Sequence, residues 1–159
     1  MKFIVSKKLI DNRALYLSVL WMLVFLIVAL ALNVTAKEIN FGITPTQWVS
    51  TILGNEEEFI DPLGLNDLLL SLHTDLFGLI LIFILITSLL IRTSRPKALK
   101  LIILLVGVSA LLLYGIGLVS SVWIGSVGII ASWIGFIVFH LLMSGCAMDI
   151  LILLLRKKF

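Results

Sequence analysis

Four long apolar segments dominate the sequence and leave few alternatives for its fold. They cover residues 14–34, 67–91, 99–122 and 127–155. A helix rises about 1.5 Å per residue and satisfies its own backbone hydrogen bonds, so each segment can cross a bilayer core of about 30 Å. We therefore predict an all-α integral membrane protein built as a four-helix bundle.

The composition supports one membrane domain over residues 1–159. Hydrophobic residues make up 61% of the 159 residues and charged residues 13%, which is far from the balance of a soluble domain. The single cysteine, Cys146, excludes a disulfide within the chain. The basic residues flank apolar segments, which argues against nucleic-acid binding. We find no phosphate-binding loop, zinc spacing or nucleophile with a base, so the sequence leaves open whether the protein is an enzyme.

The distribution of charge predicts the orientation in the membrane. Basic residues cluster before the first segment, between the second and third, and at the end of the chain. They are Lys2, Lys7, Lys8 and Arg13, then Arg92, Arg95, Lys97 and Lys100, then Arg156, Lys157 and Lys158. By the positive-inside rule, both termini lie in the cytoplasm and residues 35–66 form an outer loop, in a bacterial-type inner membrane. The first segment is longer than a signal-peptide core of about 7–15 residues, so we expect a retained helix.

The stretch "TPTQWVSTILGN" in this loop predicts a short helix. Thr44 can cap it, Pro45 suits its first position and Gln47 completes a capping box, while Gly54 can end it. Its apolar residues, with Trp48 among them, fall on one face. We therefore expect an interfacial helix lying along the outer membrane surface.

Two ionisable residues, His73 and Asp75, stand near the start of the second segment. They diverge by about 200° on a helix, so they need separate explanations. Asp75 is expected to reach a neighbouring helix or water. The helical stripe of His73 also contains Leu69, Leu70, Phe77 and Ile80. This stripe predicts that His73 points into apolar packing.

The other histidine, His140, lies in the fourth segment at a depth similar to that of His73. Counted from Arg92 and Arg156, the two heights differ by only about 5 Å. Two imidazoles that face each other across a bundle can ligate one b-type haem. This layout resembles that of small two-histidine membrane cytochromes, in the four spans and two histidines alone. The resulting hypothesis is an electron-transfer subunit of a larger respiratory or oxidoreductase complex, with His73 and His140 as haem and metal ligands.

The surroundings of His140 fit the haem hypothesis and ordinary helix packing alike. A strip of small residues leads into and along the fourth segment, and aromatic residues accompany it. The small residues are Gly125, Gly128, Ser132 and Gly135, and the aromatic ones are Phe77, Phe136 and Phe139. Such a strip admits either a flat macrocycle or the backbone of a neighbouring helix.

Three alternatives stay open beside the haem hypothesis. The first is a cofactor-free accessory or assembly subunit, bound to other membrane subunits, whose histidines form hydrogen bonds between helices. The second is copper(I) handling by the soft ligands His140, Met143, Cys146 and Met148. The third is a proton path through His73, Asp75, His140 and Asp149, although the opposed helical directions of these four residues count against it. Asp149 itself is expected to pair with a partner or with interfacial water.

Overall fold

The described part of the chain folds into four long α-helices and one short α-helix. The computed structural model describes residues 13–156, and the predicted basic residues 2, 7, 8, 157 and 158 lie outside that range. The long helices are α1 (Arg13–Phe41), α3 (Leu65–Arg92), α4 (Lys97–Ile124) and α5 (Ser126–Leu155), and the short one is α2 (Pro45–Leu53). Each long helix is long and apolar enough to span a membrane. The predicted all-α membrane fold with four spanning helices is therefore confirmed.

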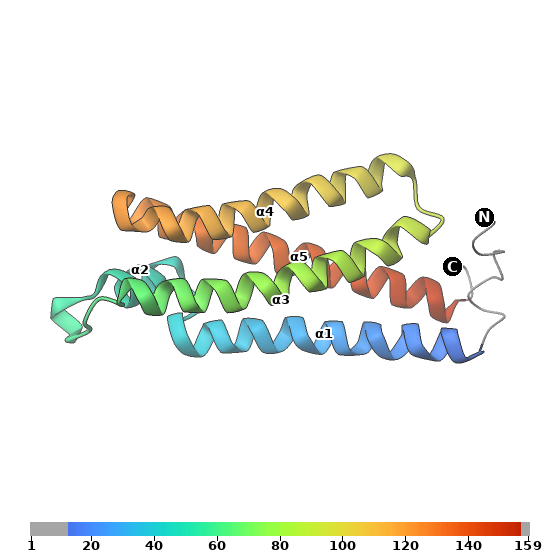
Figure 1. Cartoon of the computed structure of the whole chain (residues 1–159), viewed down its shortest axis with the longest axis horizontal. Helices are drawn as coiled ribbons and strands as arrows, with labels where there is room; N and C mark the ends of the chain where they lie inside the picture. Colours follow the sequence, from blue (N-terminus) through green and yellow to red (C-terminus); the bar gives the residue numbers. More distant parts are fainter. Residues whose placement is uncertain (1–12, 157–159) are drawn as a thin grey trace.

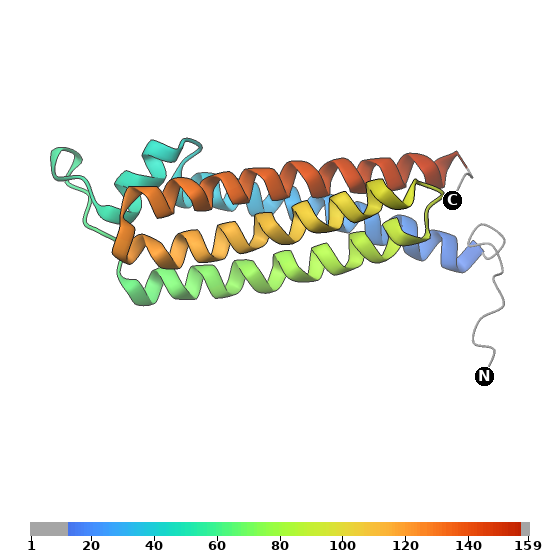
Figure 2. The same ribbon diagram turned by 90° about the horizontal axis from the view of Figure 1, so that it is seen from above.

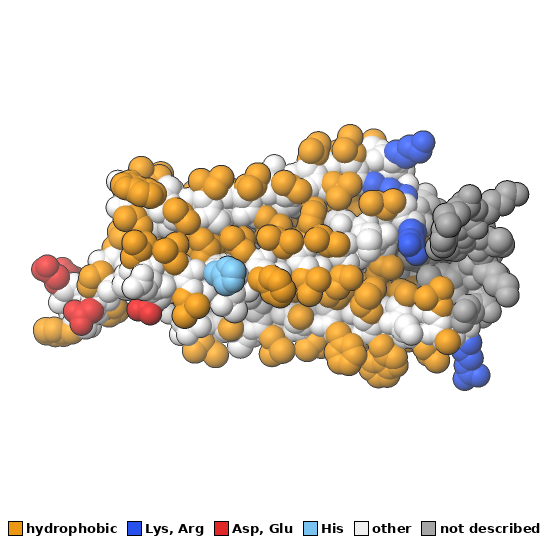
Figure 3. All heavy atoms as spheres, in the orientation of Figure 1, with side chains coloured by type: hydrophobic (Ala, Val, Ile, Leu, Met, Phe, Trp, Pro, Cys, Tyr) orange, Lys and Arg blue, Asp and Glu red, His pale blue; other side chains and the backbone are white. Residues whose placement is uncertain are grey.

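The long helices lie side by side along one axis (Figures 1 and 2). The segment from Gly42 to Gly64, which contains α2 and a 3₁₀ turn over Glu56–Glu58, gathers at one end, here called the loop end. The connection between α3 and α4 lies at the other end, here called the basic end. Figure 3 shows blue basic side chains at the basic end, red acidic ones at the loop end, and an apolar surface between them. This is the pattern of a protein surrounded by lipid.

The first helix extends beyond the apolar segment that predicts it. We expected a span ending at Val34, whereas α1 continues to Phe41. Lys37, expected in the outer loop, therefore lies within the helix and is buried. A basic side chain is thereby brought against the other helices of the bundle.

Helix α2 forms as its capping signals predict. The Thr44 hydroxyl accepts a hydrogen bond from the backbone N–H of Gln47, and the side-chain oxygen of Gln47 accepts one from the backbone N–H of Thr44. Its apolar face, however, turns toward the bundle. Trp48 is buried with its ring 5.3 Å from the Phe41 ring and 5.6 Å from the Phe136 ring. Burial against α1 and α5 thus takes the place of the lipid contact expected for Trp48.

Small residues let α4 and α5 pack backbone to backbone. Gly125, with φ of +59°, joins the two helices in a left-handed conformation that favours glycine. Farther along, a Cβ atom on Gly128 would lie 2.7 Å from the carbonyl oxygen of Gly117. A Cβ atom on Gly135 would lie 2.6 Å from the backbone nitrogen of Tyr114. The small-residue strip of α5 is therefore filled by α4, which leaves no space there for a macrocycle.

Candidate functional site: a buried polar network

An ion pair lies between α1 and α3, toward the loop end of the bundle. The Lys37 ammonium is 2.5 Å from Oδ2 of Asp75, and the two side chains are only 5% and 13% exposed. The Tyr114 hydroxyl of α4 donates a second hydrogen bond to the same carboxylate oxygen, at 2.7 Å. Ion pairs in such surroundings require further hydrogen bonds to offset the cost of removing both charges from water. Tyr114 and the neighbours described below supply them.

The Lys37 ammonium has polar and aromatic neighbours besides Asp75. It donates a hydrogen bond to the Ser71 hydroxyl at 3.0 Å. Its nitrogen lies 4.3 Å from the centre of the Phe41 ring, and 5.9 Å from the ring centres of Trp48 and Tyr114. Aromatic faces attract a cation most strongly where water is excluded. The site therefore holds a positive charge with one carboxylate and several rings around it.

Asn33 connects this ion pair to His140. Its amide nitrogen donates to Oδ1 of Asp75 at 3.3 Å, and its amide oxygen lies 3.0 Å from Nε2 of His140. The Nδ1 atom of His140 is 2.8 Å from the backbone oxygen of Phe136. The network thus joins α1, α3, α4 and α5 through side chains, and within residues 13–156 it leaves no buried side-chain nitrogen or oxygen without a partner.

Both ring nitrogens of His140 are engaged by neighbouring protein oxygens. Each ring nitrogen faces an oxygen that accepts hydrogen bonds, from Phe136 on one side and from Asn33 on the other. A neutral ring would lose one of these bonds unless the Asn33 amide turned over. That rotation would place the amide oxygen against the Asp75 carboxylate, where two acceptors would repel each other. Asn33 therefore links the hydrogen bonding of His140 to that of the Asp75 carboxylate.

His73 lies elsewhere. Its side chain is exposed, as are those of Leu69, Leu70, Phe77 and Ile80. The prediction that this stripe points into the bundle is therefore wrong, and the stripe faces outward. The reason is physical: in a membrane both the inner and the outer faces of a helix are apolar, so hydropathy does not separate them. The expected divergence of His73 and Asp75 is seen, with Asp75 turned inward.

The two histidines do not form a site for one haem in this chain. Such a site requires two ring nitrogens directed at one iron from opposite sides. The His140 ring is buried, and protein oxygens occupy both of its nitrogens. His73 faces away from the bundle, on the surface of α3. The side chains present here therefore do not fit a haem held between His73 and His140.

The predicted copper ligands and Asp149 do not gather into one site either. Met143 and Cys146 are buried near His140 on α5, but Met148 is 46% exposed, so the four predicted copper ligands do not share one surface. Among residues 13–156, no three His, Cys, Asp or Glu side chains gather in a group that could hold a metal ion. Asp149 pairs with Arg95 at the basic end and takes no part in the network.

The Arg95–Asp149 pair offers an exposed counterpart to the buried ion pair. Nε of Arg95 donates to Oδ2 of Asp149 at 2.9 Å, and these hydrogen bonds together with the negative charge raise the pKa of Arg95. Water and salt screen such a pair, so it adds little to stability.

We expect Asp149→Asn to leave the thermal unfolding midpoint close to that of the unmodified protein, with little dependence on salt concentration. A loss of stability comparable to that of a change at Asp75 would contradict this.

Part of the network can be predicted from the sequence. Asp75 and His140 are ionisable residues within predicted spans, and the sequence predicts that Asp75 reaches a neighbouring helix or water. Asn33, Lys37 and Tyr114 were missed. The available signal was the spacing of Asn33 and Lys37, which stand four residues apart and so share a helix face. That signal has meaning only if α1 continues past Val34, as the structure shows.

Comparison with known proteins agrees with this architecture. The model of the Aq_1264_TM family, described as a transmembrane helical domain, matches residues 42–158. The match includes Asp75, Tyr114 and His140, whereas Asn33 and Lys37 of α1 precede it. No curated protein and no solved structure matches the chain. The protein belongs to the Aq_1264_TM family of transmembrane helical domains.

Proposed function

We propose that this protein is a cofactor-free subunit of a membrane protein assembly. The observation that carries the proposal is the state of the two histidines. His140 is used in hydrogen bonds that hold helices together, and His73 is presented to the surroundings. The interior is thus organised for structure, and the surface offers a polar group at which another chain can bind.

The charge distribution supports a definite orientation for this subunit. Arg92, Arg95 and Lys97 lie at the basic end, together with Arg13 and Arg156, while Glu56, Glu57 and Glu58 lie at the loop end. The positive-inside rule then assigns the basic end and both termini to the cytoplasm, as in a bacterial-type inner membrane. The loop end, with α2 and the acidic turn, faces outward, so the buried network lies in the outer half of the membrane.

The competing hypothesis is electron transfer through a b-type haem. It receives no support from the positions of His73 and His140, but it makes a sharp spectroscopic prediction. A haem with two histidine ligands gives narrow absorption bands in the reduced state, and replacing either ligand abolishes them.

The experiment that decides between the two is a reduced-minus-oxidised spectrum of protein purified in mild detergent from haem-replete cells. We expect a spectrum without haem bands, and elution in an assembly larger than one chain. His73→Ala and His140→Ala serve as matched variants. Sharp bands that disappear in either variant would overturn the cofactor-free proposal, and elution as a single chain directly from native membranes would overturn the assembly role.

A further inference from the structure

The exposed side of α3 carries a stripe that resembles the seam of a helix pair, interrupted only at Thr87, which is buried. Its members are His73, Phe77, Ile80, Ile84 and Ile91, and all are exposed. They follow one another at spacings of four, three, four and seven residues. Side chains at such spacings stay on one face when two helices cross at a shallow left-handed angle.

His73 is the polar member of this stripe and stands about two turns into α3. α3 has 28 residues, so it is about 42 Å long, and His73 stands about 12 Å from its first residue. With a bilayer core of about 30 Å centred on the helix, the ring lies within the hydrocarbon. No hydrogen bond or ion pair joins its side chain to another residue within the described range 13–156. Lipid tails offer an imidazole no partner, which favours contact with protein.

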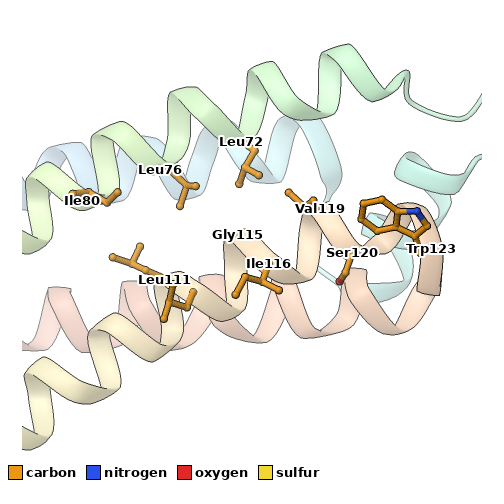
Figure 4. A pocket seen from close by; sticks show the side chains of 10 residues that line it. Leu72, Leu76, Ile80, Leu111, Gly115, Ile116, Val119, Ser120 and Trp123 are labelled. Atoms are coloured by element: carbon orange, nitrogen blue, oxygen red, sulfur yellow. The ribbon is translucent and has the colours of Figure 1, made fainter.

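An apolar groove runs beside the stripe, between α3 and α4. Its volume is about 450 Å³, and Figure 4 shows Leu72, Leu76 and Ile80 of α3 along one wall and Leu111 and Ile116 of α4 along the other. Ile80 belongs to both the groove and the stripe. An aromatic side chain entering at the level of Phe77 would therefore find an apolar slot next to the seam.

We propose that this face binds a second copy of the chain, with α3 packed against α3 of the copy around a twofold axis along the membrane normal. Such an axis places identical residues at the same depth, so His73 meets His73 of the copy. A neutral imidazole is both a donor and an acceptor, so the two rings complement each other. Phe77, 72% exposed, would reach the α3–α4 groove of the copy.

This inference rests on the proposed assembly role and names one of its partners. A different subunit would also have to supply a polar group at the depth of His73, whereas a second copy supplies one by symmetry. An acyl chain could fill the groove, but it would leave His73 without a partner in hydrocarbon.

Disulfide cross-linking in native membranes tests the proposal. In a Cys146→Ser background, single cysteines replace Ile80 and Ile84, and a mild oxidant is added. Leu32→Cys is the control on another helix, because Leu32 is 64% exposed on α1. We expect covalent dimers from the two α3 positions, none from Leu32, and a several-fold lower yield at Ile84 when His73→Ala is added.

The other outcomes are distinguishable. Equal cross-linking at Leu32 would indicate random collision and overturn the proposal. Without cross-links at Ile80 and Ile84, the second copy is excluded from this face. The assembly role would then survive only if the protein still elutes in a larger complex, and elution as a single chain would end both.

Discussion

Replacing Asp75 by Asn is expected to lower the free energy of unfolding by about 3–5 kcal/mol, because it leaves a buried ammonium without a counter-ion. Lys37 would keep Ser71 and the aromatic rings, which do not balance its charge. Lys37→Met is expected to lower the free energy of unfolding by a similar amount, because it leaves the carboxylate of Asp75 without a counter-ion. Reversible unfolding of the purified protein in mixed micelles, followed by circular dichroism, measures both.

The double variant Lys37→Met/Asp75→Leu is the decisive control. It removes both charges together, and buried ion pairs replaced by apolar residues often show little net loss. We therefore expect most of the lost stability to return, although Tyr114 and Asn33 lose an acceptor. If the double variant loses as much free energy of unfolding as the two single variants together, the two side chains act independently, contrary to the observed contact.

The sequence predicts the helices of this fold better than their faces. Long apolar segments and the capping box at Thr44 are local signals, and both are matched by helices in the structure. In a soluble protein, polarity would mark the outer face of each helix. In lipid that contrast disappears, so the stripe of His73 could not be assigned to the inside or the outside from its hydropathy.

The network escaped prediction for a related reason. Its members come from helices far apart in the chain, and the depth of one residue relative to another depends on where each helix begins and ends. The apolar segment ends near Val34 and so predicts a loop at Lys37, yet the helix continues. A lysine next to an acidic loop is common on protein surfaces, so the local sequence does not mark Lys37 as buried. Its role depends on the carboxylate of Asp75, which lies 38 positions later and on another helix.

Gly135→Ala is expected to destabilise the protein by about 1–3 kcal/mol, because the added methyl group has no space between α4 and α5. The new Cβ atom would lie 2.6 Å from the backbone nitrogen of Tyr114 and 2.7 Å from the carbonyl oxygen of Ala110. Backbone atoms cannot move aside as the end of a flexible side chain can, so the helices must separate. That separation also pulls on Tyr114, whose hydroxyl binds Asp75.

The same helix supplies the matched control. Gly145 on α5 has no atom within 4 Å of an added Cβ, so Gly145→Ala introduces the same chemical change without a clash. Alanine favours a helix over glycine by up to about 1 kcal/mol, so this variant is expected to keep or slightly raise the unfolding midpoint measured in the same micelles. Equal effects at the two positions would mean that helix propensity, rather than the close approach of α4 and α5, governs the response. A loss of stability confined to Gly135→Ala would show that the close approach of α4 and α5 stabilises the protein. Tyr114 belongs to both this contact and the polar network, so the contact also positions the hydroxyl that binds Asp75.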